Sequence, residues 1–298
     1  MSAGATNYLV DGLVDRAQVA RRFARAAKAY ESGDFFAREI DRRMQERLDY
    51  VTLRPQRIVD LGCSRGGSFA GLAARYAEAE LLGLDLVPAM LRGAAEPPSH
   101  WRRWLGLGRE KKPLRIAADA AQLPLAAASV NLVWSNLLLH WLDDPLPALA
   151  EAQRVLAVDG LLMFSTLGPD TLRELRAAFA DGYAHTQRFI DMHDLGDMLL
   201  ACGFADPVMD MEVLTLTYDS LDRLFADLRA AGSTCAMTAR RHGLSGRQSW
   251  QAARAAYEAM RQNGKLPATF EVVYGHAWKA APKQLADGRA IIRFERPG

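Results

Sequence analysis

The chain has 298 residues, of which 50% are hydrophobic and 24% charged, and its 37 Lys and Arg against 35 Asp and Glu give a net charge of +2. This composition is that of a globular protein and excludes disordered, collagen-like and disulfide-scaffold chains. The balanced charge by itself favours neither a nucleic-acid binder nor an acidic protein, and no apolar run approaches the ~18–20 residues that a membrane span needs.

The N-terminal segment and the cysteines indicate in which cellular compartment the protein works. Residues 1–15 lack the basic start and apolar centre of a secretion signal, and their acidic residues argue against a transit peptide. The three cysteines, Cys63, Cys202 and Cys235, are far apart and odd in number, which favours a reducing compartment. We therefore expect a cytoplasmic protein.

Apolar residues at helical spacing over 17–50 predict two amphipathic helices ahead of the main domain. Strand and helix patterns then alternate, which predicts an α/β fold with a parallel sheet covered on both faces. The predicted strands are 58–61, 81–86, 114–119, 130–136 and 160–165, and the predicted helices are 68–76, 88–95 and 146–156.

The second half of the chain has a different pattern. Helices are predicted over 171–180 and 194–202, with two long strands over 208–218 and 269–279. Between the two strands lie helical stretches over about 221–231 and 246–263. Two late strands separated by helices fit an antiparallel edge on a parallel sheet.

The segment 100–112 is basic, contains two tryptophans and interrupts the α/β pattern. One interpretation is a surface insertion with a solvated charged face. The other is a docking patch for an acidic partner or a membrane surface.

A glycine-rich loop follows the first predicted strand and opens a helix, in the run Asp60-Leu-Gly62-Cys-Ser64-Arg-Gly66-Gly67. In a doubly wound sheet this is where a nucleotide binds, because glycines let the backbone approach the ligand. Carboxylates end the next two strands, at Asp85 and Asp119. Asp85 can accept hydrogen bonds from ribose hydroxyls, and Asp119 can meet an adenine amino group. With these residues, the candidate cofactor site comprises Asp60, Gly62, Ser64, Gly66, Asp85, Leu86, Asp119, Ala120 and Asn136.

The sequence of the loop indicates which of two classes of nucleotide the site binds. A dinucleotide site has the pattern G-x-G-x-x-G, whereas this loop has G-x-x-x-G-G and begins at Asp60. A carboxylate at that point repels phosphate and suits a cation. S-adenosylmethionine carries an ammonium and a sulfonium, so the constellation favours this cofactor. The alternative is a tight turn with carboxylates that only cap strands.

At these residues the sequence resembles the class I S-adenosylmethionine-dependent methyltransferases. The run 59–66 is similar to their first motif, D-x-G-x-G-x-G, with Ser64 where the pattern has its middle glycine; serine is small enough for that position. The resemblance covers about residues 55–168. It implies a Rossmann-like, mostly parallel seven-stranded sheet with an antiparallel edge strand, N-terminal helices and a helical lid. The chain would be one domain, with helices over 17–50, a cofactor-binding core over 55–168 and a helical insertion with C-terminal strands over 169–298.

A finer resemblance runs over nearly the whole chain, to the malonyl-acyl-carrier-protein O-methyltransferases of biotin synthesis. It rests on the run Phe23–Tyr30, on 123–126, 134–137 and 154–156, on 165–175, on 189–196 and on 270–278. The resemblance implies transfer of a methyl group from S-adenosylmethionine to the free carboxylate of a malonyl thioester, with the acyl-carrier protein as partner.

Two other functions stay open. An arginine-hydroxylase-like assembly factor of mitochondrial complex I shares the closing Leu266-Pro-Ala-Thr-Phe270 and the form of the glycine loop. A non-catalytic cofactor-binding assembly module is the other alternative.

The implied reaction directs attention to positioning residues, because a carboxylate is already ionised at neutral pH and needs no general base. The candidates are Tyr30 on the N-terminal helix, His140 after the fourth strand, and Arg173, which could pair with the malonyl carboxylate. Each also has a purely structural interpretation, in the core or on the surface. Weaker candidates are Arg176, His193 and His276.

Metal and nucleic-acid sites receive little support. The histidines and cysteines lack C-x-x-C or H-x-x-x-H spacing, so no metal site is predicted. The run 135–138 lacks the Asn/Asp-Pro-Pro-aromatic signature of enzymes that methylate amino groups of nucleic acids. Two groups of cations are candidate contacts for an acidic carrier protein: Arg102, Arg103, Arg109, Lys111 and Lys112, and the pair Arg240 and Arg241.

Overall fold

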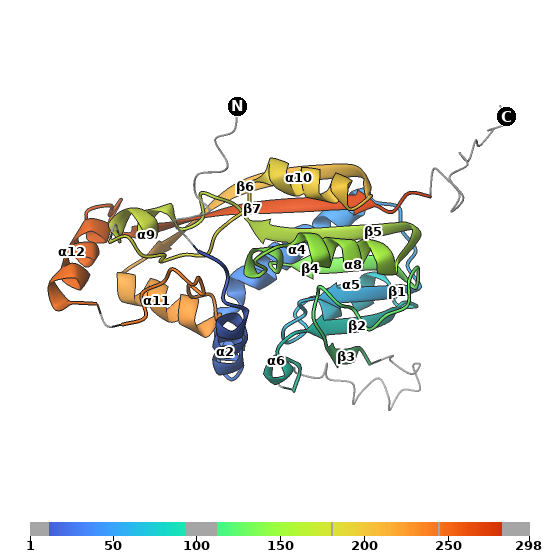
Figure 1. Cartoon of the computed structure of the whole chain (residues 1–298), viewed down its shortest axis with the longest axis horizontal. Helices are drawn as coiled ribbons and strands as arrows, with labels where there is room; N and C mark the ends of the chain where they lie inside the picture. The colour runs from blue at the N-terminus through green and yellow to red at the C-terminus, as the bar shows by residue number, and fades with distance from the viewer. Residues whose placement is uncertain (1–11, 93–111, 180, 244, 282–298) are drawn as a thin grey trace.

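The computed structural model of the chain describes residues 12–92, 112–179, 181–243 and 245–281. The predicted strands combine into one seven-stranded sheet of order β3-β2-β1-β4-β5-β7-β6 (Figure 1). Its strands are β1 (Arg57–Leu61), β2 (Glu80–Asp85), β3 (Leu114–Ala117), β4 (Val130–Asn136), β5 (Leu156–Leu167), β6 (Ala205–Tyr218) and β7 (Leu266–Trp278). The α/β expectation is confirmed.

Strands β1 to β5 run parallel to one another, and β7 runs antiparallel to both β5 and β6. The expected antiparallel pair at one edge is therefore present, with β7 inserted between β5 and the edge strand β6. The strand order reverses between β1 and β4, whose carboxyl ends carry Asp60 and Asn136. Ligands of open α/β sheets bind at such a switch point.

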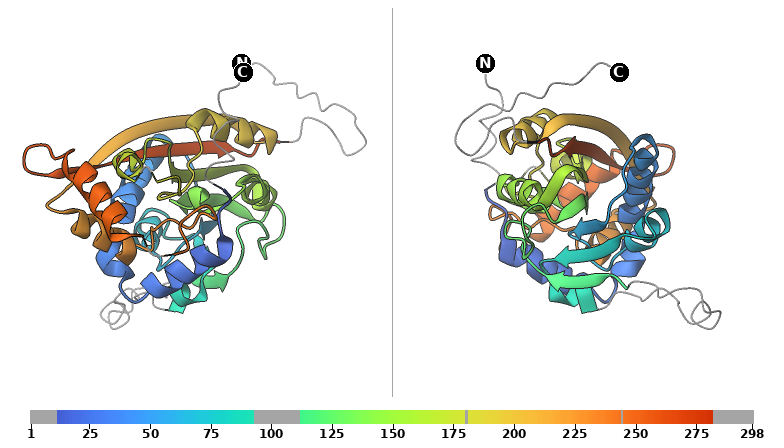
Figure 2. Two further views of the ribbon diagram at one scale, coloured as in Figure 1. Left: turned by 60° about the vertical axis from the view of Figure 1, so that its left-hand side comes forward. Right: turned by 90° about the vertical axis from the view of Figure 1, so that its right-hand side faces the viewer.

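Helices cover both faces of the sheet (Figure 2). One face packs on α4 (Phe35–Arg47) and α5 (Phe69–Arg75), and the other on α8 (Leu146–Val155) and α10 (Met192–Ala201). The alternation of side chains along each strand divides the core: Ile58 lies in the first cluster and Val59 in the second. The sheet is thus buried on both sides, which explains its continuous apolar runs.

The remaining helices lie over the carboxyl edge and the long ends of β6 and β7 (Figure 1). They are α2 (Arg16–Ala26), α3 (Tyr30–Gly33), α6 (Pro88–Arg92), α9 (Arg173–Ala178), α11 (Leu221–Ala230) and α12 (Arg247–Glu258). A 3-10 turn at Leu139–Trp141 (η2) follows β4, and another at Leu48–Tyr50 (η1) ends α4 ahead of β1. Asp15 caps α2 by accepting the Gln18 N–H at 2.9 Å, and Ser220 caps α11.

The largest differences between predicted and observed boundaries lie at the start of β5 and at the end of α12. The strand predicted over 160–165 spans Leu156–Leu167, because α8 ends at Val155 and the chain enters β5 without a loop. The helix predicted over 246–263 ends at Glu258. Asn263 and Gly264 then adopt positive φ of 49° and 78°, which turns the chain into β7.

Two findings concern segments singled out earlier. The Trp-rich basic segment 100–112 lies outside the described residues except for Lys112. In the part of the chain that the structure describes, the helices are all too short or too polar to cross a bilayer.

Candidate functional site

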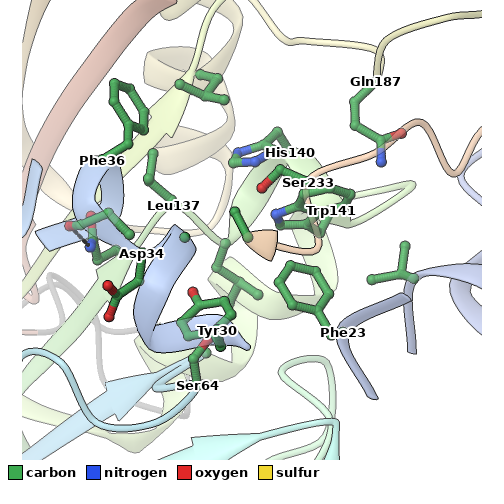
Figure 3. Close-up of a pocket in the computed structure, with 18 of the residues that line it drawn as sticks. Phe23, Tyr30, Asp34, Phe36, Ser64, Leu137, His140, Trp141, Gln187 and Ser233 are labelled. Atoms are coloured by element: carbon green, nitrogen blue, oxygen red, sulfur yellow. Dashed lines mark hydrogen bonds between the residues drawn. The ribbon is translucent and has the colours of Figure 1, made fainter. Parts of the chain in front are cut away.

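A cavity of about 670 Å³ opens at the carboxyl ends of β1, β2 and β4. Helices α2, α3 and α4 cover it together with the segment 231–235 (Figure 3). All nine predicted cofactor-site residues line this one cavity: Asp60, Gly62, Ser64, Gly66, Asp85, Leu86, Asp119, Ala120 and Asn136. Their roles toward a bound group remain predictions.

The Asp85 carboxylate, at the end of the next strand, fixes the conformation of the glycine loop. Gly62 and Gly66 have positive φ of 77° and 82°, and Ser64 shares the left-handed region with φ of 47°. The backbone N–H of Ser64 donates to Asp85 Oδ2 at 2.9 Å, and the N–H of Val87 donates to Asp85 Oδ1 at 2.8 Å. Asp85 therefore fixes the loop and the start of α6 at the same time.

Glycine is required at residue 66 for a steric reason. A Cβ atom there would lie 2.5 Å from the Phe69 ring, which packs into the core beneath the loop. Any side chain would push the loop or the ring away, so the close turn depends on glycine.

Asp60 is a buried carboxylate poised for a cation. Its side chain is 1% exposed, and among the described residues Oδ2 has no hydrogen-bond partner. Burial raises the pKa of Asp60 well above the usual range, and the nearby Asp41 and Asp85 add to the effect. An uncompensated buried carboxyl is costly, and an ammonium group of a ligand would supply the missing partner.

Asp41 carries part of the same negative potential and is held by neutral donors. It accepts the Trp134 indole N–H at 3.0 Å and the Gln45 amide N–H at 2.6 Å. The Trp134 indole also lies 3.2 Å from the Ser68 hydroxyl. Burial raises the pKa of Asp41, and the proximity of Asp41 also raises the pKa of Asp60. A positively charged ligand beside the two carboxyls would favour their ionised forms.

Two predicted cofactor-site residues have polar atoms already engaged within the protein. The Asn136 amide donates to the Ala37 carbonyl at 2.8 Å and accepts the Ser165 hydroxyl at 2.7 Å, which joins α4 to the sheet edge. Asp119 pairs with Arg16 at 2.5 Å. This ion pair ties α2 to the end of β3, where the adenine end of a nucleoside would lie.

Tyr30 and His140, two of the three predicted positioning residues, line the cavity. Tyr30 begins α3 beside Ser64 (Figure 3), and burial raises the pKa of its phenol. His140 lies in η2 and is 5% exposed, with Nδ1 3.2 Å from the Thr166 hydroxyl. Burial lowers the pKa of His140 to about 3, so the imidazole is neutral at physiological pH.

The third, Arg173, does not lie in the cavity. Its side chain is 56% exposed and pairs with Asp170 at 3.2 Å, because α9 turns Leu172 and Leu175 inward and leaves Arg173 on the solvent side. Arg176 donates to the Pro169 and Thr171 carbonyls, outside the cavity. The predicted role of Arg173 toward the substrate is therefore not supported by its position.

The two weaker histidine candidates also lie elsewhere. His193 is 84% exposed and pairs with Asp191 at the start of α10. His276 is half-buried in β7, where burial lowers its pKa. Among the described residues, no group of three or more His, Cys, Asp or Glu side chains is arranged to hold a metal ion.

Several site residues were missed from the sequence. Asp34, which precedes α4, is 8% exposed and lines the cavity (Figure 3), and its carboxyl pairs with Arg38 at 3.0 Å. Trp141, Gln187 and Ser233 line the end of the cavity nearest His140. Asp34 had the signal of an ordinary helix cap, and Gln187 and Ser233 stand in loops with no motif, so only the fold brings them together.

Arg65 joins the glycine loop to helices α2 and α3, which form a lid over the cavity. Its guanidinium donates to Glu31 at 2.8 Å and to the Ala27 carbonyl at 2.8 Å, and its side chain is 18% exposed. The residue that follows Ser64 in the loop thus holds the turn between α2 and α3. Loop and lid form one unit around the cavity.

The effect of Ser64 on the cofactor site can be measured directly. We expect Ser64→Gly to leave S-adenosylmethionine affinity within threefold and to stabilise the fold by up to about 1 kcal/mol, because glycine relieves the left-handed backbone. The hydrogen bond to Asp85 uses the backbone N–H and is retained. Calorimetric titration and thermal unfolding measure both effects.

The matched control for this substitution is Ser64→Ala, which removes the hydroxyl and keeps the strained backbone. A tenfold loss of affinity in both variants would contradict the prediction and assign the hydroxyl a direct role in binding.

The comparisons agree with this geometry. A family model described as a methyltransferase domain matches residues 59–164. The malonyl-[acyl-carrier protein] O-methyltransferase of Laribacter hongkongensis is 49% identical over 94% of this chain and 96% of its own length. The proteins of the same name from Gallionella capsiferriformans and Legionella pneumophila are 46% and 40% identical, over 94% and 91% of this chain and 97% and 93% of their own lengths.

Solved structures share the fold at low sequence identity. The YcgJ protein of Bacillus subtilis is similar with a TM-score of 0.54 and 16% identity, over 81% of this chain and 100% of its own. A Bacillus halodurans protein titled a putative methyltransferase has a TM-score of 0.55 and 16% identity, over 80% of this chain and 99% of its own. These similarities concern the fold alone.

Proposed function

The chain belongs to the malonyl-[acyl-carrier protein] O-methyltransferase family, and on that premise we propose that it methylates the free carboxylate of malonyl-acyl-carrier protein with S-adenosylmethionine, as in biotin synthesis. The observation that carries the proposal is the buried Asp60, which lines the cavity of about 670 Å³ together with the glycine loop and whose Oδ2 has no hydrogen-bond partner among the described residues. A cationic cofactor fits that environment, and a pyrophosphate does not.

The residues present fit S-adenosylmethionine. Asp60 would hold the ammonium group, the loop from Gly62 to Gly66 would pass along the ligand, and Asp85 would accept from the ribose. When bound, S-adenosylmethionine supplies an electrophilic methyl group on a sulfonium centre.

The protein's own contribution is positioning and exclusion of water. A malonyl carboxylate is ionised at neutral pH, so it attacks without a base once it is aligned and desolvated. Much of the cavity lining is apolar: Phe189 lies beside His140 at 6.0 Å between ring centroids, and Leu172, Leu175 and Phe270 also line the cavity. Such a lining strips water from the nucleophile and accommodates the uncharged ester product.

We assign His140 the role of a neutral hydrogen-bond donor toward the acyl group. Nδ1 lies 3.2 Å from the Thr166 hydroxyl, and when that hydroxyl donates to Nδ1, the proton of the ring stays on Nε2. A neutral donor orients a carboxylate without giving it a proton. Tyr30, which lies beside Ser64 on the lid, would close the cavity over the reacting atoms.

The experiment incubates the purified chain with methyl-labelled S-adenosylmethionine and malonyl-acyl-carrier protein, with the acetyl form as control. We expect label only on the malonyl form, released as methanol by mild alkali, as a methyl ester requires. Label on both forms, or alkali-stable label, would contradict carboxyl methylation. A cytoplasmic location, expected from the sequence, stays a prediction.

A further inference from the structure

We propose that the solvent face of α2, with the adjoining end of α6, is the docking surface for the acidic carrier domain that delivers the acyl group. This inference rests on the proposed function and adds to it the surface that the carrier contacts. The basic face is defined by four exposed cations: Arg21, Arg25, Lys28 and Arg92.

The cations form one stripe along the helix. Arg21, Arg25 and Lys28 stand at positions i, i+4 and i+7, so they project from the same side of α2 and the turn that follows it. Residues Val19, Phe23 and Ala26 have the same spacing on the other side and pack inward, with Val19 and Phe23 lining the cavity. The basic face and the reaction cavity are therefore separated by one helix.

The surface carries no acid on either helix. Helix α2 reads RAQVARRFARA and α6 reads PAMLR. The acids at its border are each paired with an arginine: Asp15 with Arg240 at 3.3 Å and with Arg21 of the face itself at 3.9 Å, Glu31 with Arg65, and Asp119 with Arg16. Within the described residues, Arg25, Lys28 and Arg92 make no ion pair, so their charge is available to a partner.

The mouth of the cavity opens beside this face. Arg16 and Glu31 flank α2 at its two ends, line the cavity and have side chains 62% and 58% exposed. Leu86, which precedes α6, also lines the cavity and is 37% exposed. In both Figures 1 and 2, α2 and α6 lie next to each other, with Met90 of α6 buried against Ala27.

Other surfaces around the cavity fit an acidic partner less well. Helix α11 also lines the cavity, but its Arg223 is offset by Asp222 and Asp227. The pair predicted from the sequence is engaged in the protein: Arg240 is 15% exposed and bonded to Asp15, and Arg241 pairs with Asp181 and stacks on Tyr183. The cations predicted at 102–111 lie outside the described residues.

The test compares two double variants of equal net charge. Arg25→Glu with Lys28→Glu reverses two of the four cations and so neutralises the basic face, and Arg54→Glu with Arg247→Glu reverses two exposed cations outside α2 and α6. Each is assayed with malonyl-acyl-carrier protein and with malonyl-pantetheine, which has the same reacting group and no protein surface. Thermal unfolding of each variant monitors the fold.

We expect the first variant to lose at least tenfold in kcat/KM for the carrier substrate at low salt, with malonyl-pantetheine unchanged within twofold and the control variant unchanged with both. Added salt should narrow the difference, because exposed charges are screened. Titration with the unacylated carrier should show the same loss of affinity without any turnover.

Equal losses with both substrates, or no loss with the carrier, would overturn the proposal. If the wild-type protein methylated neither substrate, the proposed function itself would fail, so the two failures are distinguishable.

Discussion

Replacing Asp85 with alanine is expected to lower the affinity for S-adenosylmethionine by at least 100-fold, or about 2.7 kcal/mol. The carboxylate accepts backbone N–H groups from Ser64 and Val87 at 2.9 and 2.8 Å, so its loss frees the glycine loop as well as the proposed ribose contact. Charge-assisted hydrogen bonds of this kind contribute about 1.5–3 kcal/mol each. Calorimetric titration with S-adenosylmethionine and S-adenosylhomocysteine measures the loss.

The matched control is Asp119→Ala, at the end of the neighbouring strand. Its side chain is 28% exposed and already pairs with Arg16, so we expect at most a tenfold loss. Asp85→Asn retains one acceptor and should fall between the two. An Asp85→Ala variant that bound the cofactor as the wild type does would remove the basis for the cofactor site.

Replacing His140 with leucine is expected to lower kcat with malonyl-acyl-carrier protein by about 100-fold. Removal of one hydrogen-bond donor that positions the reacting group lowers kcat by about this factor. The affinity for S-adenosylmethionine should stay within threefold. His140→Gln keeps an N–H donor and should recover part of the rate. Steady-state kinetics and calorimetric titration on the same samples separate the two effects, and an equal loss in both would assign His140 a packing role only.

The pH dependence of kcat distinguishes a His140 that donates a hydrogen bond as a neutral ring from a His140 that acts as a general base. Burial lowers the pKa of His140 to about 3, against about 6.5 in an unfolded chain. We therefore expect no change of kcat between pH 6 and 8 from this residue. A rate that rose with a midpoint near pH 6.5 and lost that rise in His140→Gln would contradict the assignment.

The same shift has a consequence for stability. Between pH 3 and 6.5 the unfolded chain binds a proton at His140 that the native chain does not, so the free energy of unfolding falls as the pH is lowered through this window. The slope contributed is about 1.4 kcal/mol per pH unit below 6.5, and it vanishes above that pH. Denaturant unfolding at pH 7 and 5.5 should show the slope in the wild type and a smaller one in His140→Gln.

The sequence by itself determined the sheet and the cofactor edge. Strand and helix patterns are local, and a βαβ unit has one favoured hand, so the order of the elements brings Asp60, Asp85 and Asp119 to one edge. The glycines at 62 and 66 were recognisable because the backbone conformation they adopt is open to few other residues. The family also followed from the sequence, since its motifs extend over nearly the whole chain.

Only the tertiary structure decided which side chains of α2 and α3, and which side chains near His140, line the cavity. By its sequence pattern Arg173 is as suitable as His140, yet the chain buries Leu172 before α9 and Leu175 within it and leaves Arg173 in solvent. A short helix turns inward the face that buries the most apolar area. The surface of the core on which that face packs is built by distant parts of the chain, so the sequence of the helix alone does not reveal it.

The lid contacts join residues far apart in the sequence. Arg65 meets Glu31, Asp119 meets Arg16, and Gln187 and Ser233 reach the wall near His140. Local patterns carry no information on such pairs, because each residue taken alone reads as solvated surface or loop. The sequence thus determined the chemistry at the sheet edge, and the packing of the lid decided how a substrate can approach it.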